Sequence, residues 1–331
     1  EDWETLLSFL PHDYEELAVA HGQLETRFGP TKVRTAEELL RLIFIHVGVG
    51  LALRQTVALV AEAGGPDISA MRLHMRMRRA SAYLHALVTR LIATSAVAAP
   101  ELWGDLDPVA VDATTVSGPG ATGIDARIHT ALRLTNIEIV HVEVTDVSGG
   151  ESLKRFGWKP GQLAIGDRGY ANPPGVAAVV DAGADVLIRL NRGALPVYEG
   201  AEPVDVLARL RALHGCRACE WPVDVRVAGK VERRLAGRLV AVRLPEKEAE
   251  EARGRVRREY GRDVTDELLE AAGYVALFTT LPRRKFPAGR CLEMYRLRWQ
   301  IELQFKRWKS ICGLDRLPNY RDATIRSWLY A

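Results

Sequence analysis

The segment QLAIGDRGYANPPGVAAVVDAGADVLIRL (residues 162–190) is the part of this sequence that decides the fold class. An apolar run ends in an aspartate, a turn rich in glycine and proline follows, and a helix rich in alanine and valine leads into a second apolar run. The pattern predicts a strand, a turn, a helix and a strand. Such alternation is typical of α/β proteins.

Three β-branched runs precede that segment. They are DPVAVDATTV (107–116), ARIHTALRLT (126–135) and IEIVHVEVTD (137–146), and polar turns separate them. This spacing predicts an antiparallel meander, with ESLKRFG (151–157) as a short helix leading to the next strand. An antiparallel meander followed by alternating helices and strands indicates a mixed α/β sheet.

The regions on either side of that segment differ in their hydrophobic periodicity, and these differences divide the chain into parts. Residues 1–103 carry helical periodicity and almost no strand signal. Residues 104–191 hold the predicted sheet, and residues 192–273 interrupt it with a predicted β-hairpin or small sheet (221–244) and a charged helical stretch. Residues 274–331 return with the buried strand YVALFTTL and a basic helix. We therefore expect four parts with these boundaries.

Bulk properties exclude several classes of protein. The 331 residues carry a net charge of only +3, so any affinity for nucleic acid must come from local patches. Four cysteines in a chain of this length do not suggest a disulfide scaffold. The longest apolar run, LIFIHVGVGLAL (42–53), is short for a membrane span, and the acidic N-terminus does not resemble a signal peptide. We expect a cytoplasmic protein with no membrane association.

The helical region contains a candidate DNA-binding face. Helical patterns on both sides of GGPD (64–67) outline a helix–turn–helix. In the second helix Arg72, Arg76, Arg79 and Tyr83 follow at steps of four, three and four, which puts them on one face. A basic stripe of this kind suits DNA, whereas the simpler interpretation is a solvated helix face.

Three aspartates end predicted strands, where α/β sheets place their ligands. They are Asp112, Asp146 and Asp167. A solitary aspartate at such a position is most often a turn former or a helix cap, and the local pattern does not rank the three.

The segment YRLRWQIELQFKRWKS (295–310) predicts a single helix with an unusual polar face. At about 100° per residue, one arc of roughly 80° holds an aromatic ring, three cations and a lone carboxylate. These are Tyr295, Arg298, Glu302, Lys306 and Lys309. The opposite side carries Leu297, Ile301 and Trp308, which we expect to face the core. The carboxylate is either a salt-bridge partner or a metal ligand.

Other candidate motifs are weak. CRAC (216–219) has no second pair of zinc ligands, GPGATG (118–123) lacks the ending of a P-loop, and no H-E-x-x-H pattern occurs.

Taken in order, four motifs resemble those of bacterial insertion-sequence transposases of the type-four family. Tyr295-x2-Arg298-x3-Glu302-x6-Lys309 looks like the YREK signature of that family, and AVDATTV (110–116), GIDARIH (123–129) and AIGDRGY (164–170) resemble its upstream motifs. The resemblance implies a DDE transposase: an α/β, ribonuclease-H-like catalytic core interrupted by a β-rich insertion, with an N-terminal all-helical DNA-binding region. It also implies that Asp112, Asp167 and Glu302 form the catalytic triad.

The chemistry that the resemblance implies is metal-dependent cleavage of transposon ends and strand transfer into target DNA by a cut-and-paste route. Two divalent ions, Mg²⁺ or Mn²⁺, would be bound by the triad, with Asp112 bridging them. Arg298 and Lys309 would hold phosphates and Tyr295 would contact the DNA backbone. From their positions, Lys306 and Arg168 are further candidate phosphate contacts.

The partners implied are double-stranded DNA, as transposon ends and as target, and a second copy of the chain on paired ends in the bacterial nucleoid. Family members also stack a flipped base on an aromatic ring, for which Trp221 and Trp299 are candidates, although burial in the core is the simpler expectation for both.

Two alternatives use the same residues differently. A ribonuclease-H-like nuclease or resolvase would cut with the same carboxylates and transfer no strand. A regulator derived from a transposase would bind DNA without catalysis.

Overall fold

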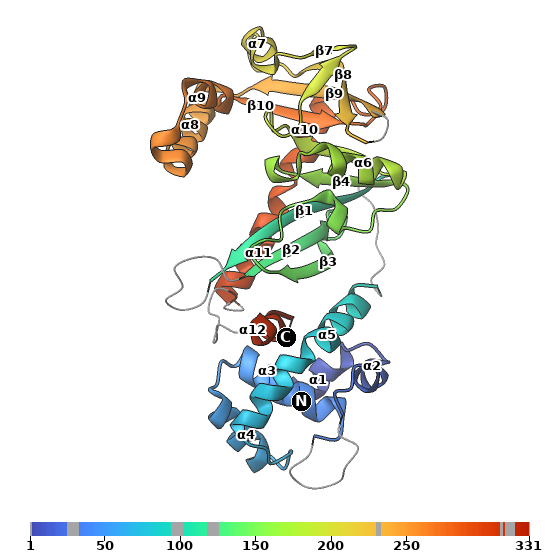
Figure 1. Cartoon of the computed structure of the whole chain (residues 1–331), viewed down its shortest axis with the longest axis vertical. Helices are drawn as coiled ribbons and strands as arrows, with labels where there is room; N and C mark the ends of the chain where they lie inside the picture. The colour runs from blue at the N-terminus through green and yellow to red at the C-terminus, as the bar shows by residue number, and fades with distance from the viewer. Residues whose placement is uncertain are drawn as a thin grey trace.

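The computed structural model of the chain describes residues 2–24, 33–93, 102–117, 126–229, 233–311, 314 and 322–330. Helices α1–α5 and α12 gather at the end of the molecule where both termini lie (Figure 1). Strands β1–β3 occupy the middle, and the segments predicted as an insertion form the far end. In the described residues no helix is both long enough and apolar enough to cross a membrane.

The first hundred residues are helical where they are described, as predicted. The helices are α1 (Asp2–Ser8), α2 (Tyr14–Ala20), α3 (Ala36–Gly48), α4 (Leu53–Glu62) and α5 (Ala70–Ala93). A capping box of Thr35 and Glu38 starts α3 by satisfying its first free N–H groups. These helices share a core that also includes residues at the ends of β1, β2 and β3.

The C-terminal helix α12 (Asp322–Tyr330) packs against α5 and ties the helical end to the sheet. The Ser327 hydroxyl donates a hydrogen bond to the Met77 carbonyl of α5. The Tyr330 hydroxyl accepts one from the Val144 N–H of β3 at 3.0 Å. Segments separated by about 200 residues are therefore packed together.

One ten-stranded sheet runs through the rest of the chain, in the order β3-β2-β1-β4-β5-β10-β9-β8-β6-β7. The predicted meander is confirmed: β2 (Ala126–Arg133) pairs antiparallel with both β1 (Asp107–Val116) and β3 (Glu138–Thr145). Strand β4 (Gln162–Gly166) runs parallel to β1, and β5 (Asp185–Arg189) runs parallel to β4. Helix α6 (Pro173–Asp181) makes the connection between β4 and β5, as its sequence predicts.

The predicted β-hairpin is confirmed, because β8 and β9 pair antiparallel, and this hairpin extends the main sheet instead of forming a small sheet of its own. The strands of the β-rich interruption are β6 (Val197–Glu199), β7 (Glu202–Pro203), β8 (Cys219–Val227) and β9 (Arg233–Arg243). Strand β9 pairs with β10 (Tyr274–Thr279), which pairs with β5 on its other edge. The physical reason is that β10 would otherwise present an unpaired edge, and β9 satisfies its N–H and C=O groups.

The helices that follow β5 complete the fold. Helix α7 (Val206–Arg211) lies between β7 and β8, and α8 (Glu246–Tyr260) and α9 (Asp266–Ala272) lie between β9 and β10, with the 3-10 turn η3 (Gly261–Asp263) between them. Helices α8 and α9 project to one side of β10 (Figure 1) and share a small apolar core of their own.

Two helix predictions need correction. The segment predicted as one helix over 295–310 is two helices, α10 (Ala288–Arg296) and α11 (Trp299–Ile311). The N–H groups of Leu297 and Arg298 bond three residues back instead of four, which tightens the chain at that point. Met294 of α10 and Ile301 of α11, on either side of the tightened turn, are both fully buried. The predicted helix 151–157 is only a 3-10 turn, η1 (Leu153–Arg155), after which Phe156 turns into the core.

Candidate active site

Asp112 lies in the body of β1, opposite Thr130 of β2. Its side chain is 16% exposed, and its Oδ1 accepts a hydrogen bond from the Ala113 N–H at 2.8 Å. Burial raises the pKa of this carboxyl to about 7, and the negative charge of Asp167 contributes to that rise in pKa. A carboxyl with so high a pKa is one whose charged form lacks adequate compensation.

Asp167 is the first residue after β4, and strand register brings it beside Asp112. Ala110 of β1 pairs with Ile165 of β4 in parallel register, and the two aspartates lie two residues beyond those partners. Residues two apart on a strand point to the same face, so the two carboxylates share one face. The Asp167 Oδ1 accepts a hydrogen bond from the Gly169 N–H at 2.9 Å and caps the 3-10 turn η2 (Arg168–Tyr170).

Arg298 links Asp112 to Glu302. Its Nη1 lies 3.6 Å from the Asp112 Oδ2, and its Nη2 lies 2.6 Å from the Glu302 Oε1. Helix α11 packs against β1, which brings Glu302, in the first turn of α11, to the strand of Asp112. The Glu302 side chain is 48% exposed. In the part of the chain that is described, no three His, Cys, Asp or Glu side chains form a ready metal cage.

A cleft of about 920 Å³ opens beside the aspartates and runs toward α8 and α9. Asp167, Arg168, Tyr295 and Arg298 are among its lining residues. Arg189, the last residue of β5, also lines it, and burial followed by the charge of Arg168 lowers the pKa of its guanidinium. One wall of the cleft therefore concentrates positive charge next to the carboxylates.

The other predicted contacts lie elsewhere. Lys306 is exposed and Lys309 is half-buried, and both lie further along α11, outside the lining of the cleft. Trp299 is exposed, so the expectation of a core position was wrong, while Trp221 packs partly buried against the sheet core. The glycine-rich segment 118–123 lies outside the described residues.

The stripe predicted on α5 is not a single open face. Tyr83 is fully buried, and its hydroxyl donates a hydrogen bond to the Tyr14 carbonyl at 3.1 Å. Arg76 donates a hydrogen bond to the Gln23 carbonyl at 2.6 Å, which ties α5 to the end of α2. The placement of Tyr83 on a polar face was wrong because the core of the helical region reaches further around α5 than the spacing suggests. Arg72 is half-buried and Arg79 is exposed.

Asp146, the third strand-end aspartate, forms a turn. Its Oδ1 accepts hydrogen bonds from the Ser148 N–H at 2.9 Å and from the Ser148 hydroxyl at 2.5 Å. This exposed carboxylate takes the turn-forming role expected of a solitary aspartate at a strand end.

Sequence reasoning missed Arg189 and Glu151. Arg189 ends an apolar strand, the same local signal that singled out the aspartates, and applying that signal to cations would have found it. Glu151 follows two glycines in a connecting segment and carries no such signal. Only the folded chain brings it to the cleft.

Comparisons with known proteins identify the family of the chain. The family described as "Transposase DDE domain" matches residues 103–331. The putative transposase InsL of insertion sequence element IS186A from Escherichia coli (strain K12) is 30% identical over 340 residues, covering 100% of this chain and 91% of the relative. The transposase of insertion sequence element IS421 from Escherichia coli is 30% identical over 341 residues, with the same coverage. The chain therefore belongs to the family of insertion-sequence transposases that carry a DDE domain.

Proposed function

We propose that this protein performs cut-and-paste transposition, with Asp112, Asp167 and Glu302 as its catalytic carboxylates. The observation that carries the proposal is the position of Arg298, whose guanidinium contacts both Asp112 and Glu302 while Asp167 lies beside Asp112. Three acids from segments 55 and 135 residues apart in the sequence are thereby drawn to one place. A surface salt bridge alone would not require such convergence.

The donor set fits a divalent cation, which transposases with a DDE domain use. Carboxylate oxygens are the ligands that Mg²⁺ and Mn²⁺ prefer, and Asp167 raises the pKa of Asp112 by like-charge repulsion that a cation would relieve. We assign Asp112, Asp167 and Glu302 as the holders of two such ions. When bound, the ions activate the attacking oxygen and stabilise the leaving 3′-oxyanion. Glu302 would become free to bind a cation once the Arg298 guanidinium binds a DNA phosphate in place of the Glu302 carboxylate.

Cations around the carboxylates would hold the DNA. Arg298, Arg168 and Arg189 line the cleft and suit phosphate oxygens, which arginine binds with two parallel hydrogen bonds. Tyr295 lines the same cleft and would pack against the DNA backbone. Lys306 and Lys309 would meet phosphates further along α11.

The remaining assignments concern the parts of the chain. Strand order β3-β2-β1-β4-β5, with three antiparallel strands and two parallel ones, supports a ribonuclease-H-like core formed by residues 104–191 and 274–331. Residues 192–273 are then the insertion, and residues 1–103 bind the transposon end through cations such as Arg72 and Arg79. A homodimer would hold two ends together.

The test combines nicking and joining. Labelled double-stranded element ends are incubated with Mg²⁺ or Mn²⁺ and a target plasmid, using wild type, Asp167→Asn and Glu302→Gln. We expect nicked and integrated products from wild type and neither product from the variants. Full cleavage by either variant contradicts the proposed site, and cleavage without joining by wild type indicates a nuclease.

A further inference from the structure

A fourth carboxylate, Glu151, reaches the same cleft from the segment between β3 and η1. Its position is defined by Gly169. A Cβ on Gly169 would lie 1.6 Å from the Glu151 Oε2 and 3.4 Å from the Asp167 Oδ1, so both carboxylates surround one point. Any larger residue at position 169 would push Glu151 away. The glycine therefore makes room for an acid beside Asp167.

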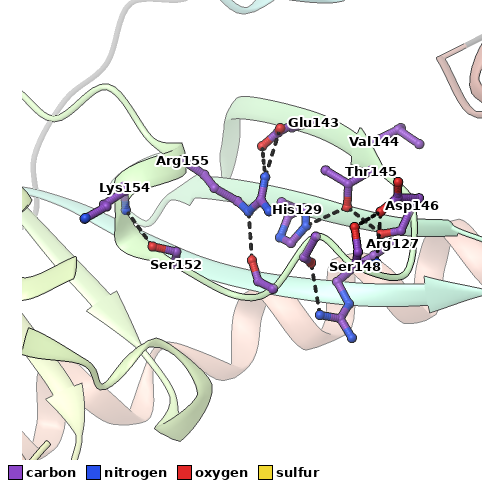
Figure 2. Close-up of polar contacts among 12 residues, drawn as sticks. Arg127, His129, Glu143, Val144, Thr145, Asp146, Ser148, Ser152, Lys154 and Arg155 are labelled. Atoms are coloured by element: carbon purple, nitrogen blue, oxygen red, sulfur yellow. Dashed lines mark hydrogen bonds and ion pairs between the residues drawn. The ribbon is translucent and has the colours of Figure 1, made fainter. Parts of the chain in front are cut away.

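The backbone before Glu151 is fixed by two arginines (Figure 2). Arg127 Nη1 donates a hydrogen bond to the Gly149 carbonyl at 3.1 Å, and Arg155 Nε donates one to the Gly150 carbonyl at 2.8 Å. Arg155 is itself held by Glu143 of β3 through bonds of 3.0 and 3.1 Å to its two carboxylate oxygens. The segment that presents Glu151 is thus anchored to the meander.

In the described part of the chain, Arg127 is near enough for its charge to act on the Glu151 carboxylate but forms no ion pair with it. Among the described residues, no side chain or N–H group donates a hydrogen bond to Glu151 or forms an ion pair with it, although the residue is half-buried. Glu302 differs, because Arg298 already neutralises it. A partly buried anion that forms no ion pair among the described residues, next to another anion, suits a positive ion that the protein does not itself supply.

Tyr170 provides an independent sign of a ligand. This residue is fully buried beneath the site, and its hydroxyl has no hydrogen-bond partner among the described residues. After burial, the charges of Glu151, Asp112 and Asp167, in that order, raise the pKa of the hydroxyl, so it lies among all three carboxylates. Buried polar groups are rarely left unsatisfied, and one explanation for such a group is a water or an ion bound beside it.

We propose that Glu151 is a fourth acidic residue of the catalytic site, which binds a divalent cation together with Asp167, while Tyr170 acts as a positioning residue for these carboxylates. The proposal rests on the proposed function, since it concerns the same metal ions. It adds a ligand that lines the cleft and is less exposed than Glu302.

Manganese binding by the metal-free full chain tests the proposal without relying on activity. Mn²⁺ is titrated and the free ion is followed by electron paramagnetic resonance for wild type, Glu151→Gln, Asp167→Asn and Gly169→Ala. The matched control is Glu259→Gln, an exposed acid on the far wall of the same cleft. We expect Glu151→Gln and Gly169→Ala each to weaken Mn²⁺ binding about tenfold or more, and the control to leave it unchanged.

Thermal unfolding verifies that each variant is folded. If Glu151→Gln does not fold, Glu151→Asp takes its place, because it keeps the charge but shortens the reach, and the same weakening is expected. The role of Glu151 is overturned if the Glu151 variant binds Mn²⁺ and nicks ends like wild type while Asp167→Asn is inactive. That result leaves the proposed function standing. A wild-type protein that neither binds Mn²⁺ nor nicks ends overturns both.

Discussion

Replacing Asp112 with Asn should stabilise the protein while abolishing its activity. The carboxyl of Asp112 is mostly buried, and its pKa rises on folding from an ordinary value of 3.8 to about 7. Between those two values the folded state holds a proton that the unfolded state has lost. Stability that is fully present below the unfolded pKa is therefore lost as the pH rises through the folded pKa, and Asn escapes this loss because it does not titrate.

The magnitude follows from the shift in pKa. One unit of pKa corresponds to about 1.4 kcal/mol. The raised pKa of Asp112 therefore lowers the free energy of unfolding by about 4 kcal/mol at pH 8 and by about 2 kcal/mol at pH 5. The hydrogen bond from the Ala113 N–H can be kept by the amide oxygen of Asn. The free energy of unfolding of Asp112→Asn should therefore exceed that of wild type by more at pH 8 than at pH 5.

Urea unfolding in the presence of a chelator measures this difference at both pH values. Asp146→Asn is the matched control, because Asp146 is an exposed strand-end aspartate whose pKa is lowered by hydrogen bonds from Ser148. That control should not gain stability at pH 8. An equal difference between Asp112→Asn and wild type at pH 5 and pH 8, or a destabilised Asp112→Asn at pH 8, refutes the reasoning.

Three further outcomes are expected. Gly169→Ala, whose Cβ would lie 1.6 Å from the Glu151 carboxylate, should displace that flexible side chain and cost less than about 1 kcal/mol in urea unfolding, as should Gly157→Ala, with nothing within 4 Å; a larger loss at position 169 alone would mean that Glu151 cannot move. Tyr83→Phe should lose about 1 kcal/mol of stability and keep its affinity for element ends in fluorescence anisotropy; weaker DNA binding at unchanged stability would put Tyr83 on the DNA-binding face instead. Trp299→Ala should cost less than about 1 kcal/mol in thermal unfolding, against about 3–5 kcal/mol for the buried Trp103, and a comparable loss would contradict the exposed position of Trp299.

The element types followed from the sequence wherever one local period dominated. The strands around Asp112 and Asp167 are apolar runs bounded by turns, and α5 carries a long helical repeat after a glycine-proline break. The parallel register of β1 and β4 then brings Asp112 and Asp167 together, although Asp112 lies within β1 and not, as the sequence predicted, at its end. The element types depend on near neighbours in the chain, so the sequence alone carries them, whereas the pairing of β1 with β4 joins segments 55 residues apart.

Tertiary packing decided the rest. The break between α10 and α11 is a tightened turn at Leu297 and Arg298, and no local breaker residue predicts it. Joining β9 to β10 satisfies a strand edge that a linear pattern does not reveal. Glu151 reaches Asp167 because Gly169 leaves space for its carboxylate, and because Arg127 of β2 and the nearby Arg155 bind the carbonyls of the two glycines before it. The periodicity of the sequence indicates which face of a helix or strand is apolar. Which side chains come into contact across the fold depends on how whole helices and strands pack together.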